Sequence, residues 1–321
     1  MEPASEEQPE DFSRLAVIVP THNGCDLVMD CLASLSRQGR FQVIVVDDAS
    51  EDGTSRAVHS GYPIAEVVRL GERSGFTAAV NRGIEASDKD ILLLLNSDTL
   101  VPDGALDAML HAFASDARLG IGGAELFYPD SSRQWSGGRE PTLGWLLALA
   151  TGFASGLSGL PFYRWLRPVS GAGSGEVEWV TGAALALRRQ VREEIGPFDD
   201  GFAFYCQDLD YCQRARRAGW RVAVLPGFRV EHRHGATIGL AEGSTPRFNP
   251  RLLWLDLVRW ARKTGGARRA RRVAWVLRLG TCLRLLVRWS TTPLVPGSKR
   301  EMWDRDSAAF RDALAALRSN G

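Results

Sequence analysis

The 321-residue chain lacks the sequence features of disulfide-stapled, secreted and membrane-spanning proteins. Its five cysteines are odd in number and show neither CxxC spacing nor histidines at zinc-site spacing, which indicates reduced thiols. The acidic N-terminus has no apolar core of a signal peptide. No uncharged apolar run reaches about 18 residues, and the nearest candidate, residues 143–162, is interrupted by glycines and small polar residues. We therefore expect a cytoplasmic protein.

A strong excess of charge is also absent, since the net charge is +1. This balance argues against a polyanion-binding protein, and we expect no nucleic-acid partner. The charges are nevertheless unevenly distributed. Residues 1–13 begin with an acidic stretch that predicts a disordered tail, whereas residues 251–300 are rich in arginine and contain a single acid, Asp256.

Short aliphatic runs alternate with segments of helical spacing over the first 120 residues. Strands are predicted over residues 15–19, 41–46, 65–70 and 91–95, and helices over residues 26–37, 75–86 and 102–115, with a further helix opening near residue 54. This alternation predicts βαβ units, and hence an α/β fold with a mostly parallel sheet flanked by helices. Glycines after residue 120 predict loops and an insertion. Beyond them we expect a strand over residues 178–187, a helix over 204–218, a short strand over 221–225 and basic helices from residue 248 onward.

The segment Ile91–Thr99, ILLLLNSDT, is the most informative part of the chain. Its apolar run stops at Asn96, and Ser97 and Asp98 follow just past the predicted strand. The carboxyl ends of parallel strands are where open α/β sheets bind ligands. A carboxylate beside an amide oxygen offers hard ligands to a divalent cation such as Mg²⁺ or Mn²⁺, which typically also binds substrate phosphates. For this segment alone, a strand followed by an Asx turn is the alternative.

Polar residues also follow the first and second predicted strands. Pro20, Thr21 and Asn23 follow the first, where backbone groups could hold a base or a diphosphate. Asp47 and Asp48 follow the second, where a carboxylate could accept hydrogen bonds from a nucleotide base or ribose. Ordinary turns would explain each of these segments when it is considered alone.

A further segment, GFTAAVNRG, opens the helix predicted over residues 75–86. Gly75 precedes the helix, and Asn81 and Arg82 on it can face a phosphate or a sugar. The glycines do not form GxGxxG, so the segment lacks the fingerprint of a Rossmann dinucleotide site.

Two later segments carry the remaining candidates. Asp208 and Asp210 lie near the start of the helix over residues 204–218, where a carboxylate is a candidate general base. Complementation of the helix dipole is the simpler explanation of these two acids. His232 and His234 are predicted in a loop after the strand 221–225, where a neutral imidazole could complete a metal site built on Asp98.

Seven segments occur in a fixed order: PTHNG, VVDDASEDGT, GFTAAVNRG, LLLLNSDT, WVTGAALALRR, GPFDDGFAFYCQDLDYCQRARRAGW and HRHGAT. Together they resemble glycosyltransferase family 2, and the chain is most similar to the bacterial rhamnosyltransferase-like branch, from about Leu15 to about Ile238. One such motif is weakly specific, whereas seven in order are highly specific.

The resemblance implies a GT-A fold over residues 14–240, with a nucleotide-binding half over about 14–125 and an acceptor-binding half over about 126–240. Residues 241–321 would form a basic helical extension. The resemblance further implies an inverting transferase that uses a nucleotide-sugar donor and a divalent metal, Mg²⁺ or Mn²⁺. Similarity to the branch favours dTDP-rhamnose as that donor.

The resemblance also assigns roles to residues. Asp47 matches the acid that contacts the nucleotide base, and Asp208 matches the catalytic base. The residue before that base is typically Glu, and here it is Gln207, which removes one charge beside the base. The implied metal ligands are Asp98, Asn96 and His232, with Asp98 the strongest because Asn96 replaces the first acid of the usual DxD motif. The implied donor-site residues are Pro20, Thr21, Asn23, Asp47, Asp48, Gly75, Asn81, Asn96, Ser97 and Asp98.

The acceptor side is expected to include Trp179, Thr181, Gly182 and Asp210. The stretch Arg268–Trp289 mixes arginine with Trp, Leu and Val, a composition typical of membrane-surface helices. We therefore expect a saccharide or lipid-linked acceptor and a peripheral contact with the inner face of the plasma membrane. A helical bundle with snorkelling arginines, or a homodimer interface, is the alternative.

Two other functions compete with the transferase. A nucleotidyltransferase would also use carboxylates and a metal, but it would not need Asp208 and the late histidine segment in this order. A non-catalytic nucleotide-sugar-binding protein is favoured only by Gln207 and Asn96, and both leave the key acids in place. Within the transferase class, a UDP- or GDP-sugar is the alternative donor.

Overall fold

The computed structural model describes residues 12–153, 175–233 and 248–319, and the chain divides into two compact units. The first unit comprises Met1–Gly137, Ser170–Phe198 and Tyr211–Thr237, and the second comprises Gly138–Val169, Asp199–Asp210 and Ile238–Gly321. Four predicted features lie wholly or partly outside the described residues: the acidic tail up to residue 11, residues 154–162 of the apolar stretch, His234, and residues 241–247 of the C-terminal extension.

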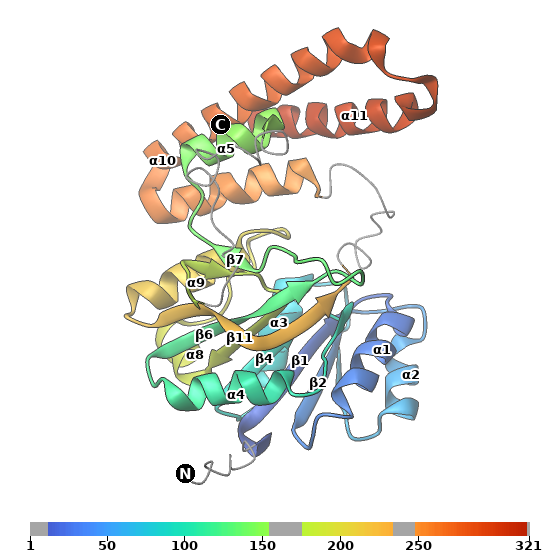
Figure 1. The fold of residues 1–321 in the computed structure, drawn as a ribbon, viewed down its shortest axis with the longest axis vertical. Helices are drawn as coiled ribbons and strands as arrows, with labels where there is room; N and C mark the ends of the chain where they lie inside the picture. The colour runs from blue at the N-terminus through green and yellow to red at the C-terminus, as the bar shows by residue number, and fades with distance from the viewer. Residues whose placement is uncertain (1–11, 154–174, 234–247, 320–321) are drawn as a thin grey trace, which may run out of the picture. The chain divides into compact units, whose positions relative to one another are not determined.

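The first unit is built on a mixed sheet (Figure 1). Its strands run in the spatial order β3 (Glu66–Arg69), β2 (Gln42–Asp47), β1 (Leu15–Thr21), β4 (Ile91–Leu95), β10 (Ala184–Arg188), β6 (Leu119–Phe127), β11 (Arg221–His232) and β5 (Thr99–Leu100), and β8 (Gly175–Glu176) also pairs with β11. The first four are mutually parallel, β10 is antiparallel to both its neighbours, and β6 is parallel to β11. The predicted α/β class with a mostly parallel sheet is confirmed.

Helices cover both faces of this sheet, which explains why its strands are apolar throughout instead of alternating. Leu15, Val17 and Val19 of β1 point to one face, into a core shared with α1 (Cys25–Leu35), α2 (Thr54–Gly61) and α4 (Ala105–Ser115). Ala16 and Ile18 point to the other, into a core shared with α3 (Phe76–Glu85), α8 (Arg189–Ile195) and the later residues of α9 (Gln207–Arg217). A 3₁₀ turn, η1 (Phe12–Arg14), precedes β1.

Two sequence predictions are wrong at the centre of the sheet. Residues 119–127, expected as loop because of their glycines, form β6. A Cβ atom on Gly122 would lie 2.5 Å from Leu225 Cδ1, and one on Gly123 would lie 2.5 Å from Val180 Cβ. These glycines therefore admit the side chains of neighbouring segments and do not mark a turn.

The strand predicted over residues 221–225 is longer than expected. It continues as β11 through a register shift between Val224 and Arg229, where Gly227 has a φ of +77°. His232 is consequently the last residue of a strand and does not lie in a loop. The strand predicted over residues 178–187 is divided into β9 (Trp179–Val180) and β10, and Gly137 of β7 (Gly137–Gly138) pairs with β9.

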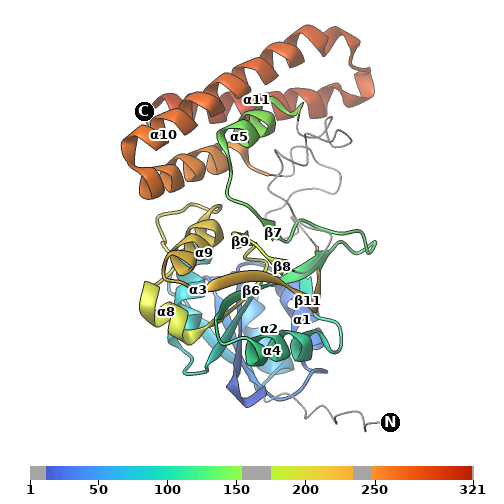
Figure 2. The ribbon, with the colours of Figure 1, turned by 60° about the vertical axis from the view of Figure 1, so that its left-hand side comes forward.

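The second unit is helical. Its helices are α5 (Leu143–Thr151), α10 (Pro250–Thr291) and α11 (Gly297–Ser319), with η2 (Thr292–Leu294) joining the last two. α10 bends at Gly265–Gly266, where the backbone is not helical, and α5 packs against it close to Gly280 (Figure 2). Trp254, Trp260 and Phe310 are fully buried. Among the described helices, none has both the length and the apolar character that a membrane crossing requires.

Candidate active site

The carboxyl ends of β1, β2 and β4 meet at one edge of the sheet. Thr21 at the end of β1 is in register with Asp47 at the end of β2, and Ile18 is in register with Leu94 of β4. Asn96 follows β4 directly and is held there because its backbone N–H donates to Ala183 O at 2.9 Å. The structure thus brings together the polar segments predicted after these three strands.

Asp48 is buried and joins this edge to the start of α3. Its Oδ1 accepts a hydrogen bond from Ser74 N at 2.6 Å, and its Oδ2 accepts one from Gly75 N at 2.8 Å. Gly75 has a φ of +89°, which disfavours any residue with a side chain. The backbone of Asp48 is held in turn by β1, because its N–H donates to Thr21 O at 2.9 Å. Sequence reasoning missed this bracing role.

Asp47 is fully buried beside it. Its Oδ1 accepts from Ser50 N at 2.8 Å, while its Oδ2 is in contact with Ser55 Oγ and lies 3.4 Å from Arg69 Nη1. Arg69 also donates to Ser50 O at 2.8 Å. The structure therefore places Asp47 at the base of a closed loop, and its contact with a nucleotide base stays a prediction.

Asn23 links the loops that follow β1 and β2. It adopts a φ of +49°, a conformation that Asn tolerates better than most residues. Its Oδ1 accepts from Glu51 N at 2.8 Å, and its N–H donates to Ser50 Oγ at 2.9 Å. Pro20, three residues earlier in the chain, lies within β1. These contacts give the edge a defined shape in advance of any ligand.

Asn81 lies in α3 and makes two hydrogen bonds to one backbone position. Its Nδ2 donates to Phe198 O at 2.9 Å, and its Oδ1 accepts from Phe198 N at 3.0 Å. Phe198 in turn stacks on Tyr211 with 3.7 Å between ring centroids. The amide of Asn81 thus holds the segment after α8, and its predicted contact with a phosphate or sugar stays untested.

Asp98 and His232 lie together because β5 pairs with the end of β11. Thr99 is the register partner of His232, and Arg233 N donates to Asp98 O at 2.9 Å. His232 Nε2 lies 3.4 Å from Asp98 Oδ1, and both side chains are buried, with 8% and 2% exposed. The structure therefore brings together two residues that are 134 positions apart in the sequence and that were predicted to share a metal.

Gln134 fixes the orientation of this histidine. Its Nε2 donates to the backbone oxygens of His232 and of Phe127, the latter at 3.2 Å, so its Oε1 is the atom that faces His232 Nδ1, at 3.0 Å. A carbonyl oxygen only accepts, so His232 Nδ1 carries the proton in this bond. In the neutral imidazole, Nε2 is then an acceptor that faces Asp98 Oδ1. Sequence reasoning missed Gln134, which lies in a stretch expected to be loop.

This arrangement fits a divalent cation. Two acceptors that face each other at 3.4 Å repel unless a cation or a proton lies between them. Within the described part of the chain, the Oδ1 of Asn96 is buried and has no hydrogen-bond partner, so an additional hard oxygen ligand is present at the same edge. Ser97 is also buried there.

The segment 179–183 begins with β9, whose partner strand is β7. Trp179 contacts Trp135 edge to face, with 4.9 Å between ring centroids, and Thr181 N donates to Ser136 O at 3.0 Å. Gly182 follows directly. The acceptor-side roles of Trp179, Thr181 and Gly182 stay predictions.

Asp208 belongs to the second unit and is the second residue of α9. Its side chain is partly exposed, whereas Gln207 and Asp210 on either side are buried. The preceding residue, Cys206, has a φ of +65°, an unfavourable conformation for a residue with a side chain. Such strain persists only where the surroundings hold it, and α10 supplies the contacts that do so.

Asp256 of α10 holds the turn before α9 by its carboxylate. Its Oδ1 accepts from Ala203 N at 3.0 Å, and its Oδ2 accepts from Phe204 N at 3.0 Å and from Tyr205 N at 2.8 Å. Asp256 is itself 3% exposed. The only acid between residues 251 and 300 is therefore committed to the loop that carries Asp208.

Lys263 holds the same loop from the next turns of α10. Its Nζ lies 2.9 Å from Asp210 Oδ2 and 2.6 Å from Asp199 Oδ2. Burial alone would raise the pKa of Asp199, but hydrogen bonds from Lys263, Gly201 N and Arg259 outweigh it and lower this pKa to about 2. Asp210 thus has a structural partner in the second unit, and its predicted acceptor contact stays untested.

Comparisons with known proteins show what the chain is similar to. Residues 16–167 match the family model of glycosyl transferase family 2. The N-acetylglucosaminyl-diphospho-decaprenol L-rhamnosyltransferase of Mycobacterium tuberculosis is 29% identical over 240 residues, which cover 70% of this chain and 78% of that protein. An O-antigen biosynthesis protein of Myxococcus xanthus is 27% identical over 235 residues, which cover 70% of this chain and 18% of that protein.

A solved structure shares the fold of this chain. It is a mannosyltransferase from Pyrobaculum calidifontis in complex with GDP-Man and Mn²⁺, with a TM-score of 0.57 and 17% identity, covering 98% of this chain and 90% of that chain. The GT-A fold expected from the sequence is confirmed by this likeness.

Proposed function

Since the chain belongs to glycosyltransferase family 2 and is therefore a nucleotide-sugar glycosyltransferase, we propose that it transfers L-rhamnose from dTDP-rhamnose, with inversion, to a hydroxyl of a lipid-linked saccharide. The name of the mycobacterial relative supports both the sugar and a polyprenyl-diphosphate-linked acceptor. The observation that carries the proposal is the pairing of Asp98 with His232 at the strand ends, together with the unsatisfied oxygen of Asn96, two residues before Asp98 in the chain.

We propose that the donor nucleotide binds at the edge formed by residues 20–23, 47–48 and 74–75. Thr21, Asn23 and Asp48 interconnect the loops of this edge, so little reorganisation would accompany binding. Backbone N–H and C=O groups of such a preformed edge can select a base without a charged side chain.

Asp98, Asn96 and His232 would hold a divalent metal, and the Mn²⁺ in the mannosyltransferase complex supports this assignment. When bound, Mg²⁺ or Mn²⁺ neutralises the negative charge that grows on the departing nucleoside diphosphate. No group of three or more Cys, His, Asp or Glu side chains converges within the described residues. A metal here would therefore depend on the donor diphosphate for part of its coordination.

Asp208 would remove the proton from the attacking acceptor hydroxyl. Its carboxylate is partly exposed and can therefore be reached, while Asp256 and Lys263 fix the loop before it through Tyr205 N and Asp199. Proton removal in the transition state increases the nucleophilicity of the hydroxyl oxygen as it bonds to the anomeric carbon. The bond from that carbon to the diphosphate oxygen breaks on the opposite face, which inverts the configuration.

Replacing Gln134 by Leu is expected to weaken the affinity for Mn²⁺ by about 10–100-fold, as measured by Mn²⁺ titration in the presence of excess dTDP. The substitution removes the acceptor that holds the proton on His232 Nδ1, so Nε2 is no longer directed at Asp98. Gln134→Glu keeps that acceptor and should retain more metal affinity than Gln134→Leu. Equal affinity in Gln134→Leu and the wild type would contradict this assignment.

Donor identity can be tested by thermal-shift titration with dTDP, UDP and GDP, each with and without Mn²⁺. A metal-dependent rise in melting temperature with dTDP is expected, because the nucleotide and metal stabilise the folded state that binds them. A rise in melting temperature with only UDP or GDP would keep the assignment as a transferase but would replace dTDP-rhamnose as the donor. The absence of a metal-dependent shift with all three would favour a non-catalytic binding protein.

A further inference from the structure

One side of α10 is apolar and exposed to solvent. Trp275, Leu279, Cys282, Leu286 and Trp289 are spaced four, three, four and three residues apart, which places them on one side of a helix. All five are exposed, and Trp275 and Trp289 expose 62% and 76% of their surface. At the rise of an α-helix this row, the apolar stripe, is about 21 Å long.

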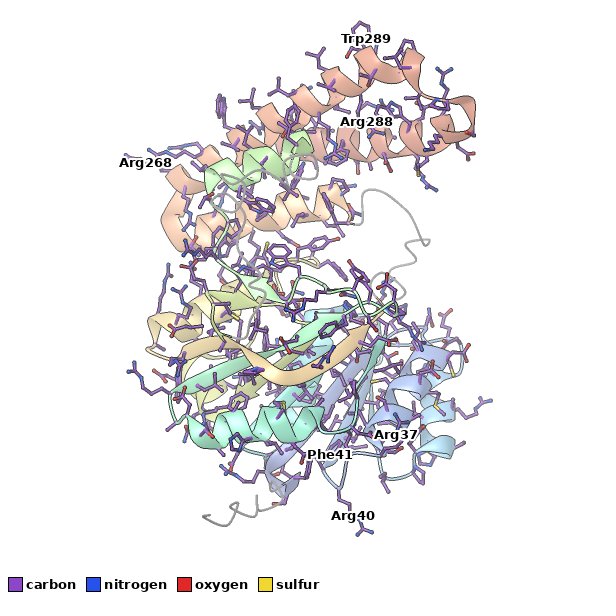
Figure 3. All side chains as sticks on the ribbon, viewed as in Figure 1. Arg37, Arg40, Phe41, Arg268, Arg288 and Trp289 are labelled. Carbon is purple, nitrogen blue, oxygen red and sulfur yellow. The ribbon has the colours of Figure 1, made fainter. Side chains whose placement is uncertain are left out.

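The stripe is distinct from the core-forming side of the same helix. On that side, the Arg284 guanidinium lies 3.9 Å from the centre of the Phe310 ring, and that of Arg288 lies 3.7 Å from the centre of the Trp303 ring. Figure 3 shows Trp289 projecting away from the helical hairpin, whereas Arg288 lies between α10 and α11. α10 therefore has a packed inner side and, separately, an apolar outer side.

Basic side chains precede the stripe on α10. Arg268, Arg271 and Arg272 lie within the two turns before Trp275, on the same side of α10, and all three are exposed. Arg268 projects from the hairpin in Figure 3. Beyond the other end, Leu294 is 81% exposed and extends the apolar surface in sequence. The only acid between residues 251 and 300, Asp256, is buried and engaged elsewhere.

We propose that this face docks on the surface of an anionic lipid bilayer, with the apolar stripe at the boundary between headgroups and acyl chains. Tryptophan favours that boundary, and arginine can keep its guanidinium among the phosphates while its methylenes contact apolar atoms. Each basic residue near an anionic leaflet adds electrostatic attraction to that surface. The charge pattern and the apolar stripe thus fit one and the same partner.

A second copy of the chain fits this face less well. The arginines before the stripe would find no acidic partner in the stripe of another copy, because the single acid of residues 251–300, Asp256, is buried. Docking on a bilayer also extends the proposed function. It rests on that function only for the statement that a lipid-linked acceptor would be met at the membrane. Lipid binding can be measured with neither donor nor acceptor present, so the two proposals can fail separately.

The test is co-sedimentation of the full chain with vesicles of phosphatidylglycerol or of phosphatidylcholine, without metal or nucleotide. The wild type is expected to bind the anionic vesicles, to bind neutral ones at least about tenfold more weakly, and to dissociate as salt is added. The double variant Trp275→Glu/Leu286→Glu should reduce binding about tenfold or more, since it places charge in the stripe. Ile64→Glu, at an 84% exposed isoleucine of the first unit, is the matched control and should bind like the wild type.

Melting temperatures of both variants near that of the wild type would show that the fold is intact. Absence of binding to anionic vesicles, or equal binding by the double variant and the wild type, would overturn the proposal. Sedimentation velocity measures the oligomeric state and so tests whether the stripe instead joins two copies of the chain. A wild-type dimer that the double variant dissociates would assign the stripe to contact between two copies, and would overturn it as well.

Discussion

Replacing Asp208 by Asn is expected to lower the rate of sugar transfer by about 10²–10⁴-fold, the range that general-base catalysis contributes. The amide cannot take up the proton of the acceptor hydroxyl, while its size and its hydrogen bond from Leu209 N can be kept. Donor binding should not change, because the residues proposed to hold the nucleotide lie in other segments. The transfer rate is measured as nucleoside diphosphate released per enzyme molecule per unit time. Donor binding is measured in parallel by titrating dTDP and recording the change in melting temperature.

Asp200→Asn provides the control for this experiment, since Asp200 is an exposed acid of the same loop. It should transfer at the wild-type rate. Transfer by Asp208→Asn at close to the wild-type rate would show that another group removes the proton. Loss of donor binding together with transfer would show that the substitution acts through the fold of the loop.

Replacing Asp256 by Ala is expected to lower the free energy of unfolding by about 2–4 kcal/mol, measured by urea titration. The change leaves the N–H groups of Ala203, Phe204 and Tyr205 without their acceptor, and unsatisfied polar groups cost about 1–3 kcal/mol each when they are buried. The estimate is below the full sum because these three residues are not fully buried.

Kinetic measurements distinguish a role of Asp256 in positioning the Asp208 loop from a role in the stability of the fold alone. If Asp256 positions the loop of Asp208, the turnover number should fall in Asp256→Ala well below the melting temperature, while KM for the donor stays near the wild-type value. Asp256→Asn retains one carbonyl oxygen and should recover part of both losses. Asp304→Ala, at an exposed acid of α11, should change neither quantity. Unchanged stability and turnover in Asp256→Ala would contradict the role given to this contact.

The sequence predicts the sheet well where its strands are short and apolar. Ile91–Leu95 forms β4 as predicted, because a buried parallel strand has a local signature of aliphatic residues ending in polar ones. Glycine is the residue type for which the predicted loop was wrong. Gly122 and Gly123 have the composition of a loop, but tertiary packing against Leu225 and Val180 makes glycine necessary within a strand.

The nearness of some candidate side chains was predictable, but their hydrogen-bond partners were not. Asp98 and His232 could be assigned to one site from an ordered set of motifs, whereas Gln134 carries no local signal for its contact with His232. Asp256 was notable in sequence only as an isolated acid in a basic segment. Its role depends on a turn more than 50 residues earlier, and such non-local hydrogen bonds appear only once the chain is folded.

The most direct test of the account is a transfer assay with the purified full chain, Mn²⁺, dTDP-rhamnose and a short-chain lipid-linked analogue of the proposed acceptor, with product configuration read by NMR. The account predicts metal-dependent release of dTDP that requires the acceptor, and a glycoside whose anomeric configuration is inverted relative to the donor. A product with retained configuration, or no transfer from dTDP-, UDP- or GDP-sugars while the donor binds, would contradict it.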